Sequence, residues 1–138
     1  MKRYAKAIWH GSGKDGRGHM TTQSEALDKH VYSFSSRFTS EGGTNPEELL
    51  AAAHAGCFTM KLSFVLDEAG YFPEALETTA YVNFENGVIT ASRLVVVGKV
   101  WGMNPEEFDA CVRDAKRNCP VSMALNIIIT TEASLQNW

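Results

Sequence analysis

Five stretches of the chain have the apolar–polar alternation, or the content of β-branched residues, that is typical of strands. They are residues 2–10, 30–38, 76–86, 88–101 and 126–131. A glycine-rich loop at residues 11–18 follows the first stretch. Between the third and the fourth, Asn86 and Gly87 form the pair that two-residue hairpin turns favour. The sequence therefore predicts mainly antiparallel strands.

The longest predicted helix begins at Pro46, after a Thr-Asn pair that offers a cap and before two glutamates that suit the positive end of the helix dipole. It should run to about Ala69 and end at Gly70. From Leu49 to Leu66 apolar residues occupy nearly every angular position, so we expect burial on most sides. A chain of this length has little material to cover both faces, and dimerisation would supply the missing cover.

A second helix is predicted from Pro105, where an asparagine cap and two glutamates repeat the same start signal. It should reach Cys119, and Pro120 closes or kinks it. Two helices with mainly antiparallel strands make an α+β fold. The length of 138 residues is that of a single domain, residues 1–138.

Composition excludes several classes of function. Hydrophobic residues make up 44% of the chain and charged residues 21%, as in soluble globular domains. The formal net charge of -3 comes without a basic stripe, so nucleic acid is not an expected partner. We expect no apolar stretch to come near the roughly 18 residues that span a membrane, because Lys61, Asp67 and Glu68 interrupt the most apolar one.

The N-terminus has no apolar segment of the kind that export signals carry, so a cytoplasmic location is expected. In a reducing cytosol the three cysteines, Cys57, Cys111 and Cys119, are more often free, catalytic or metal-binding than structural disulfides. Cys111 faces Phe108 and Ala115 on the second helix and is predicted to be a core residue.

Cys57 lies in the middle of the apolar helix and would need a nearby cation to ionise. Candidates are Arg37, Lys61 and His54, of which an arginine best suits peroxide chemistry because it can stabilise a thiolate and donate fixed hydrogen bonds. A buried guanidinium needs a carboxylate partner. Glu47 or Glu48 could supply it, and the sequence does not decide between them.

Glu47 and Cys57 are ten residues apart, which is roughly 15 Å along a helix. They cannot touch within one helix. An arginine that connects them must lie along the helix surface, or the partners come from a second copy of the same helix across a dimer interface. Both arrangements remain open at this point.

Four motifs resemble the OsmC/Ohr family of thiol-dependent organic hydroperoxide reductases, and its OsmC branch in particular. They are Phe34-x-x-Arg37-Phe, Gly43-Thr-Asn-Pro-Glu47-Glu-Leu, Ala52-Ala-His-Ala-Gly-Cys57-Phe and Ala115-Lys-x-x-Cys119-Pro-Val-Ser122. The resemblance covers essentially the whole chain. It implies an intertwined α+β homodimer whose long central helices pack together, with active sites at the subunit interface.

Carried onto the matching positions, the resemblance makes Cys57 the peroxidatic thiol, Cys119 the resolving thiol, and Arg37 with Glu47 the activating pair. It implies that Cys57 reduces organic hydroperoxides to alcohols, becoming a sulfenic acid that forms a disulfide with Cys119. No bound cofactor is implied. The reductant would be an external dithiol, such as dihydrolipoamide or a lipoylated protein.

Three other functions are compatible with some of these residue types. A metal site could use His54 and the three cysteines, but these cysteines are not closely spaced. A Cys–His hydrolase would need His54 as its base, whereas a satisfied packing role is the more common one for such a histidine. The main alternative is a non-enzymatic stress-response or ligand-binding domain that would use an apolar pocket around Cys57 without catalysis.

Overall fold

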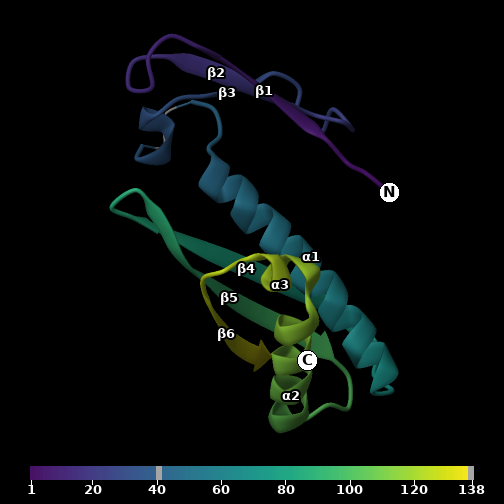
Figure 1. Cartoon of the computed structure of the whole chain (residues 1–138). Helices are drawn as coiled ribbons and strands as arrows, with labels where there is room; N and C mark the ends of the chain where they lie inside the picture. The colour runs from purple at the N-terminus through teal and green to yellow at the C-terminus, as the bar shows by residue number, and fades with distance from the viewer. Residues whose placement is uncertain (40–41, 137–138) are drawn as a thin grey trace. The chain divides into compact units, whose positions relative to one another are not determined.

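A computed structural model describes residues 1–39 and 42–136. The chain forms two compact units, Met1–Leu49 and Leu50–Trp138, and helix α1 (Pro46–Glu68) runs from the first into the second. Figure 1 shows the elements of each unit. The single domain predicted for residues 1–138 stays a prediction, because compactness does not say whether the two units unfold together.

The first unit contains a three-stranded antiparallel sheet with the order β1-β2-β3. Its strands are β1 (Ala5–His10), β2 (Arg17–Thr22) and β3 (His30–Tyr32). Strand β2 was not predicted, because its glycine and polar residues do not alternate with apolar ones as a half-buried strand does. Gly18 is needed there, since a Cβ at this position would lie 2.4 Å from the carbonyl oxygen of Ile8.

The strand predicted for residues 30–38 is wrong beyond Tyr32. The chain turns into a short 3-10 helix, η1 (Ser35–Arg37). Hydrogen bonds between side chains and backbone cause this turn, because the Ser33 amide donates to Ser36 Oγ and the Ser36 amide donates to Ser33 Oγ. Arg37 therefore lies on a helical turn and not at the end of a strand.

The second unit contains the sheet β4-β5-β6, formed by β4 (Pro73–Glu85), β5 (Val88–Val100) and β6 (Ile128–Leu135). β4 and β5 form the predicted antiparallel hairpin, and Asn86 and Gly87 have the positive φ angles that a two-residue turn requires. β6 pairs with β5 in parallel. Both sheets together are thus mainly antiparallel, with one parallel pair.

Within residues 1–39 and 42–136, three α-helices form where two were predicted. α2 (Pro105–Asn118) begins with a capping box, in which Asn104 Oδ1 accepts from the Glu107 amide and the Glu107 carboxylate accepts from the Asn104 amide. Cys119 has an extended backbone and separates α2 from α3 (Pro120–Ala124). Pro120 thus both stops one helix and starts another.

The core of the second unit lies between α1, α2 and the inner face of β5. α1 contributes one stripe of buried side chains: His54, Phe58, Leu62, Val65 and Leu66. Its helical spacing directs this stripe to one side. Gly98 on β5 lets α2 pack closely, because a Cβ there would lie 2.7 Å from the ring of Phe108.

The opposite side of α1 is exposed in the single chain, with Met60 64% and Phe64 57% accessible. Burial on most sides is therefore not achieved within one chain. The prediction that no apolar stretch reaches the length of a membrane span is also wrong. By length and composition, α1 is long and apolar enough to cross a membrane. Residues 49–66 contain a single charge, Lys61, and core helices with one buried stripe pass the same test.

Candidate active site

Two of the three cysteine side chains meet in the second unit. Cys57 lies at the edge of the buried stripe of α1, and Cys119 lies between α2 and α3 and is fully buried. Cys57 packs against the core cluster that contains Cys119, close enough for Cys119 to affect its ionisation, and both thiols are free. Residues 62 positions apart in the sequence thus form one pair, as disulfide chemistry between them would require.

The environment of Cys57 in this unit opposes ionisation. Burial raises the pKa of the Cys57 thiol above its ordinary value, and the hydrogen bond with Cys119 adds to that effect. Two contributions lower the pKa: a hydrogen bond from the Val121 backbone amide, second in size only to burial, and the weaker charge of Lys61. A reactive Cys57 would therefore need further positive charge beside it.

His54 connects α1 to two other elements of the second unit. Its Nδ1 atom lies 2.7 Å from Ser92 Oγ on β5, and its Nε2 atom lies 2.8 Å from Ser122 Oγ on α3. The ring is fully buried, and this burial lowers the pKa of His54, so the neutral form is favoured. Both ring nitrogens face hydroxyl groups, which agrees with the predicted packing role and not with a Cys–His catalytic pair.

Arg37 and Glu47 form an ion pair in the first unit. Arg37 Nε lies 3.2 Å from Glu47 Oε1, and the Glu47 side chain is 12% accessible. The structure thus answers which glutamate accompanies Arg37, because Glu48 instead accepts a 2.6 Å hydrogen bond from Thr44 Oγ1. The other oxygen of Glu47, Oε2, is buried and has no hydrogen-bond partner among the described residues.

Local signals at the start of α1 place Glu47. Asn45 caps the helix, since its Oδ1 accepts a 2.8 Å hydrogen bond from the Glu48 amide. The Asn45 amide group donates in turn to the carbonyl oxygen of Ser36, and Ser36 Oγ lies 2.9 Å from the carbonyl oxygen of Thr44. These contacts hold the turn that carries Arg37 against the start of the helix that carries Glu47.

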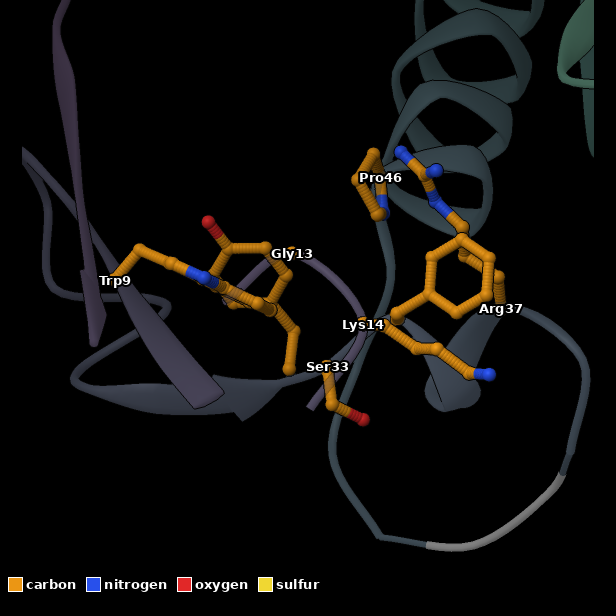
Figure 2. A pocket seen from close by; sticks show the side chains of 8 residues that line it. Trp9, Gly13, Lys14, Ser33, Arg37 and Pro46 are labelled. Atoms are coloured by element: carbon orange, nitrogen blue, oxygen red, sulfur yellow. The ribbon is translucent and has the colours of Figure 1, made fainter. Parts of the chain in front are cut away.

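Arg37 also lines a pocket of about 610 Å³ in the first unit. Figure 2 shows Arg37 beside Pro46, with Trp9 and Ser33 on the other side of the space. The remaining lining residues are Gly13, Lys14, Tyr32 and Phe34. The pocket thus combines aromatic walls with two cationic side chains, an environment suited to an amphipathic small molecule.

Sequence reasoning did not identify most of these pocket residues, although the glycine-rich loop was a usable signal. That loop is held by Ser12, whose carbonyl oxygen accepts from the Gly16 amide at 2.8 Å and from Trp9 Nε1 at 3.1 Å. The loop thereby brings Lys14 to the pocket wall.

The third cysteine, Cys111, lies in the core as predicted. Burial raises the pKa of the Cys111 thiol, which keeps it protonated. In residues 1–39 and 42–136, no group of three or more His, Cys, Asp or Glu side chains is arranged to hold a metal ion.

Comparison with known proteins gives a consistent result. A family model described as "OsmC-like protein" matches residues 39–133. Peroxiredoxin OsmC of Escherichia coli K12 is 41% identical over 141 aligned positions, covering 99% of both chains. Organic hydroperoxide resistance protein-like 1 of Staphylococcus saprophyticus is 31% identical over 78% of both chains.

Solved structures have the same fold. A Legionella pneumophila structure described as an organic hydroperoxide resistance protein OsmC and predicted redox protein has a TM-score of 0.71 at 26% identity, covering 99% of this chain and 98% of its own. An OsmC-like protein of Mycoplasma pneumoniae has a TM-score of 0.77 at 11% identity, covering 99% of both chains. The chain belongs to the OsmC-like family.

Proposed function

We propose that this protein is a cytoplasmic thiol peroxidase that reduces organic hydroperoxides to alcohols. The observation that carries the proposal is the contact between the free thiols of Cys57 and Cys119, which the fold brings together from distant positions. The names of the relatives, peroxiredoxin and organic hydroperoxide resistance protein, support the same chemistry. The aromatic pocket beside Arg37 supports organic substrates over hydrogen peroxide.

In the first step the Cys57 thiolate attacks the terminal oxygen of the hydroperoxide. The O–O bond breaks, Cys57 becomes a sulfenic acid, and the departing alkoxide takes a proton to become the alcohol. Arg37, oriented by Glu47, would stabilise the thiolate and the leaving oxygen by charge and hydrogen bonding. This role requires the guanidinium to approach Cys57 in the working protein.

In the second step the Cys119 thiolate attacks the sulfur of the Cys57 sulfenic acid. Water leaves, and a Cys57–Cys119 disulfide forms. An external dithiol, such as dihydrolipoamide on a lipoylated protein, then reduces the disulfide by two exchange reactions and is itself oxidised to a cyclic disulfide. The cycle requires no bound cofactor.

We further propose that the working protein is a homodimer in which the exposed side of α1 is covered by a second copy. Its exposed stripe, Ala52, Gly56, Met60 and Phe64, repeats every four residues and so lies along one side of the helix. An exposed apolar stripe along one side of a helix is well suited to packing against a second helix. A Cβ at Gly56 would meet no atom within 4 Å in the single chain, so the surface at Gly56 is open to a second copy.

The proposal is tested by following the consumption of tert-butyl hydroperoxide and of a fatty-acid hydroperoxide with dihydrolipoamide as reductant. Cys57→Ser should abolish turnover. Cys119→Ser should abolish turnover while still forming one equivalent of sulfenic acid. Cys111→Ser is the matched control and should retain turnover, because the proposed cycle does not use the buried Cys111 thiol.

Wild-type turnover by the Cys57→Ser protein would refute the peroxidase proposal. Absence of hydroperoxide consumption by the wild type would favour the alternative of a non-enzymatic domain with the same pocket. Loss of activity on adding a metal chelator would instead support a metal-dependent reaction.

A further inference from the structure

Ser92 and Ser122 place two hydroxyl groups against a histidine that the proposed cycle does not use. Ser92 lies in the buried row of β5 that also contains Leu94 and Val96, where a polar side chain needs a partner. Ser122 lies on α3, three residues after Cys119. His54 meets both hydroxyls and lies three residues before Cys57 on α1.

We propose that His54 is a positioning residue which, through Ser122, holds α3 against α1 and so keeps Cys119 beside Cys57. The inference rests on the proposed function for its role in catalysis, because it concerns the resolving step of that cycle. The contacts from which it is argued all lie within the second unit.

The Nε2–Ser122 contact is the link that reaches the segment carrying Cys119. α3 has only five residues, and none of them is buried, so its own packing fixes it weakly. Cys119 itself has an extended backbone, and backbone hydrogen bonds join it to both helices, since its amide donates to the Ala115 carbonyl oxygen and its carbonyl oxygen accepts from the Met123 amide. The short hydrogen bond between Ser122 and the fully buried ring adds a side-chain link that ties α3 to α1.

The Nδ1–Ser92 contact fixes the other end of the ring. A neutral imidazole donates through one nitrogen and accepts through the other, and serine hydroxyls can serve in either role. Ser92 thus sets the orientation of the ring against the sheet. With the ring held this way, its Nε2 atom faces Ser122 on α3. α3 also brings the Val121 amide to the Cys57 sulfur, so the same link supports a direct contact with the peroxidatic thiol.

Two substitutions of His54 separate these contacts. Gln has its amide group at about the reach of Nε2, so His54→Gln can keep the bond to Ser122 and lose the one to Ser92. Asn is one methylene shorter and reaches about as far as Nδ1, so His54→Asn does the reverse. A role in general core packing would make both variants equally defective, whereas the positioning role predicts that Gln preserves the thiol pair and Asn does not.

The readout is the equilibrium of the Cys57–Cys119 disulfide with a glutathione redox buffer, in a Cys111→Ser background. One oxidised glutathione converts the two protein thiols into the disulfide and yields two reduced glutathiones, so the equilibrium constant measures how close the two thiols are held. His54→Asn should lower this constant about 2- to 10-fold, the range of one net hydrogen bond, and His54→Gln should leave it nearly unchanged. Equal constants for the two variants would overturn the proposal.

A second readout uses a fixed dose of tert-butyl hydroperoxide. Mass spectrometry should find more Cys57 sulfinic acid in His54→Asn than in His54→Gln, because a distant Cys119 resolves the sulfenic acid more slowly. If wild-type protein forms no disulfide with hydroperoxide, the proposed function fails, whereas the glutathione equilibrium still reports on His54.

If neither His54 variant folds, the serine partners decide. Ser122→Ala removes the bond to α3, and Ser92→Ala removes the bond to β5 while leaving the α3 contact in place. The proposal expects Ser122→Ala to lower the disulfide equilibrium constant more than Ser92→Ala does. An equal effect of the two substitutions, or a wild-type value for Ser122→Ala, would refute it.

Discussion

Cys57 is held where burial raises its pKa, yet the proposed chemistry needs its thiolate. We expect the positive charge of Arg37 to lower the pKa of Cys57 in the working protein and so to favour the thiolate. Arg37→Ala should therefore raise the pKa of Cys57 and lower its alkylation rate at neutral pH by about tenfold or more, as loss of a nearby opposite charge does. Measuring iodoacetamide alkylation from pH 5 to 10 tests this.

Arg93→Ala is the control for that experiment, since Arg93 lies on β5 and pairs with Glu132 on β6. It should leave the alkylation profile unchanged. Identical profiles for wild type and Arg37→Ala would rule out activation by this arginine.

His54 gives the stability of the protein a specific dependence on pH. Burial lowers its pKa in the folded state below the ordinary value of 6.5, so the unfolded chain takes up a proton first as the pH falls. The free energy of unfolding should therefore decrease as the pH falls below about 6.5, and be unaffected by His54 above that value. Both ring nitrogens face neutral hydroxyls, so no carboxylate offsets this cost.

Urea unfolding at pH 7.5 and pH 5.0 measures the effect. The difference between the two pH values should be smaller for His54→Gln than for wild type, while His10, His19 and His30 are common to both proteins. A variant that loses as much stability on acidification as the wild type would contradict the assignment to His54.

Among the secondary-structure elements, η1 places Arg37, and Ser36 anchors η1. Ser36 is buried, and its Oγ lies 2.7 Å from the carbonyl oxygen of Ser33 and 2.9 Å from that of Thr44. Ser36→Ala should lower the unfolding free energy by about 1 kcal/mol and slow sulfenic acid formation, though less than Arg37→Ala does. The rate is measured in a Cys119→Ser background.

Ser35→Ala is a matched control, because Ser35 lies on the same turn and its hydroxyl is exposed. It should behave like the parent protein. If Ser35→Ala and Ser36→Ala slow the reaction equally, the anchoring role of Ser36 is wrong.

The elements that sequence predicted well are those with strong local signals. Asn45 and Asn104 each precede a proline and act as caps, which fixed the starts of α1 and α2. The β4–β5 hairpin followed from its Asn-Gly turn. η1 and α3 were missed because tertiary and side-chain contacts stabilise such short helices more than propensity does.

The candidate site also contains residues that local sequence motifs reveal and contacts that they do not. Cys57, Cys119, Arg37 and Glu47 lie in recognisable motifs, and the ion pair of the last two has a short sequence separation. The contacts of His54 do not, since its partners lie 38 and 68 positions away. No local pattern reports such contacts, because they arise only when the sheet and α3 have packed.

At the scale of the whole molecule, the apolar outer side of α1, which carries Met60 and Phe64, is exposed in the described chain. If a second copy covers this side of α1, Met60→Glu should place a charge in the interface and shift the protein from dimer toward monomer. The loss of association free energy should be several kcal/mol, on the order of the cost of burying an unpaired charge. Light-scattering mass measured over a dilution series tests the prediction.

Val88→Glu provides the comparison, because Val88 is 57% accessible and lies at the hairpin turn between β4 and β5. It adds the same charge to a different exposed apolar residue and should leave the mass unchanged. A wild-type protein with the mass of one chain would refute the dimer, and an unchanged mass for Met60→Glu would place the interface elsewhere.

The parallel pairing of β6 with β5 also sets the order in which the thiol pair can come into being. Cys119 lies within the α2–α3 crossover, which is held at both ends only once the C-terminal strand Ile128–Leu135 has joined the sheet. Parallel pairing over such a crossover is a late event in folding, because the loop must close before its contacts form. We therefore expect the contact between Cys57 and Cys119 to form only after β6 has paired with β5.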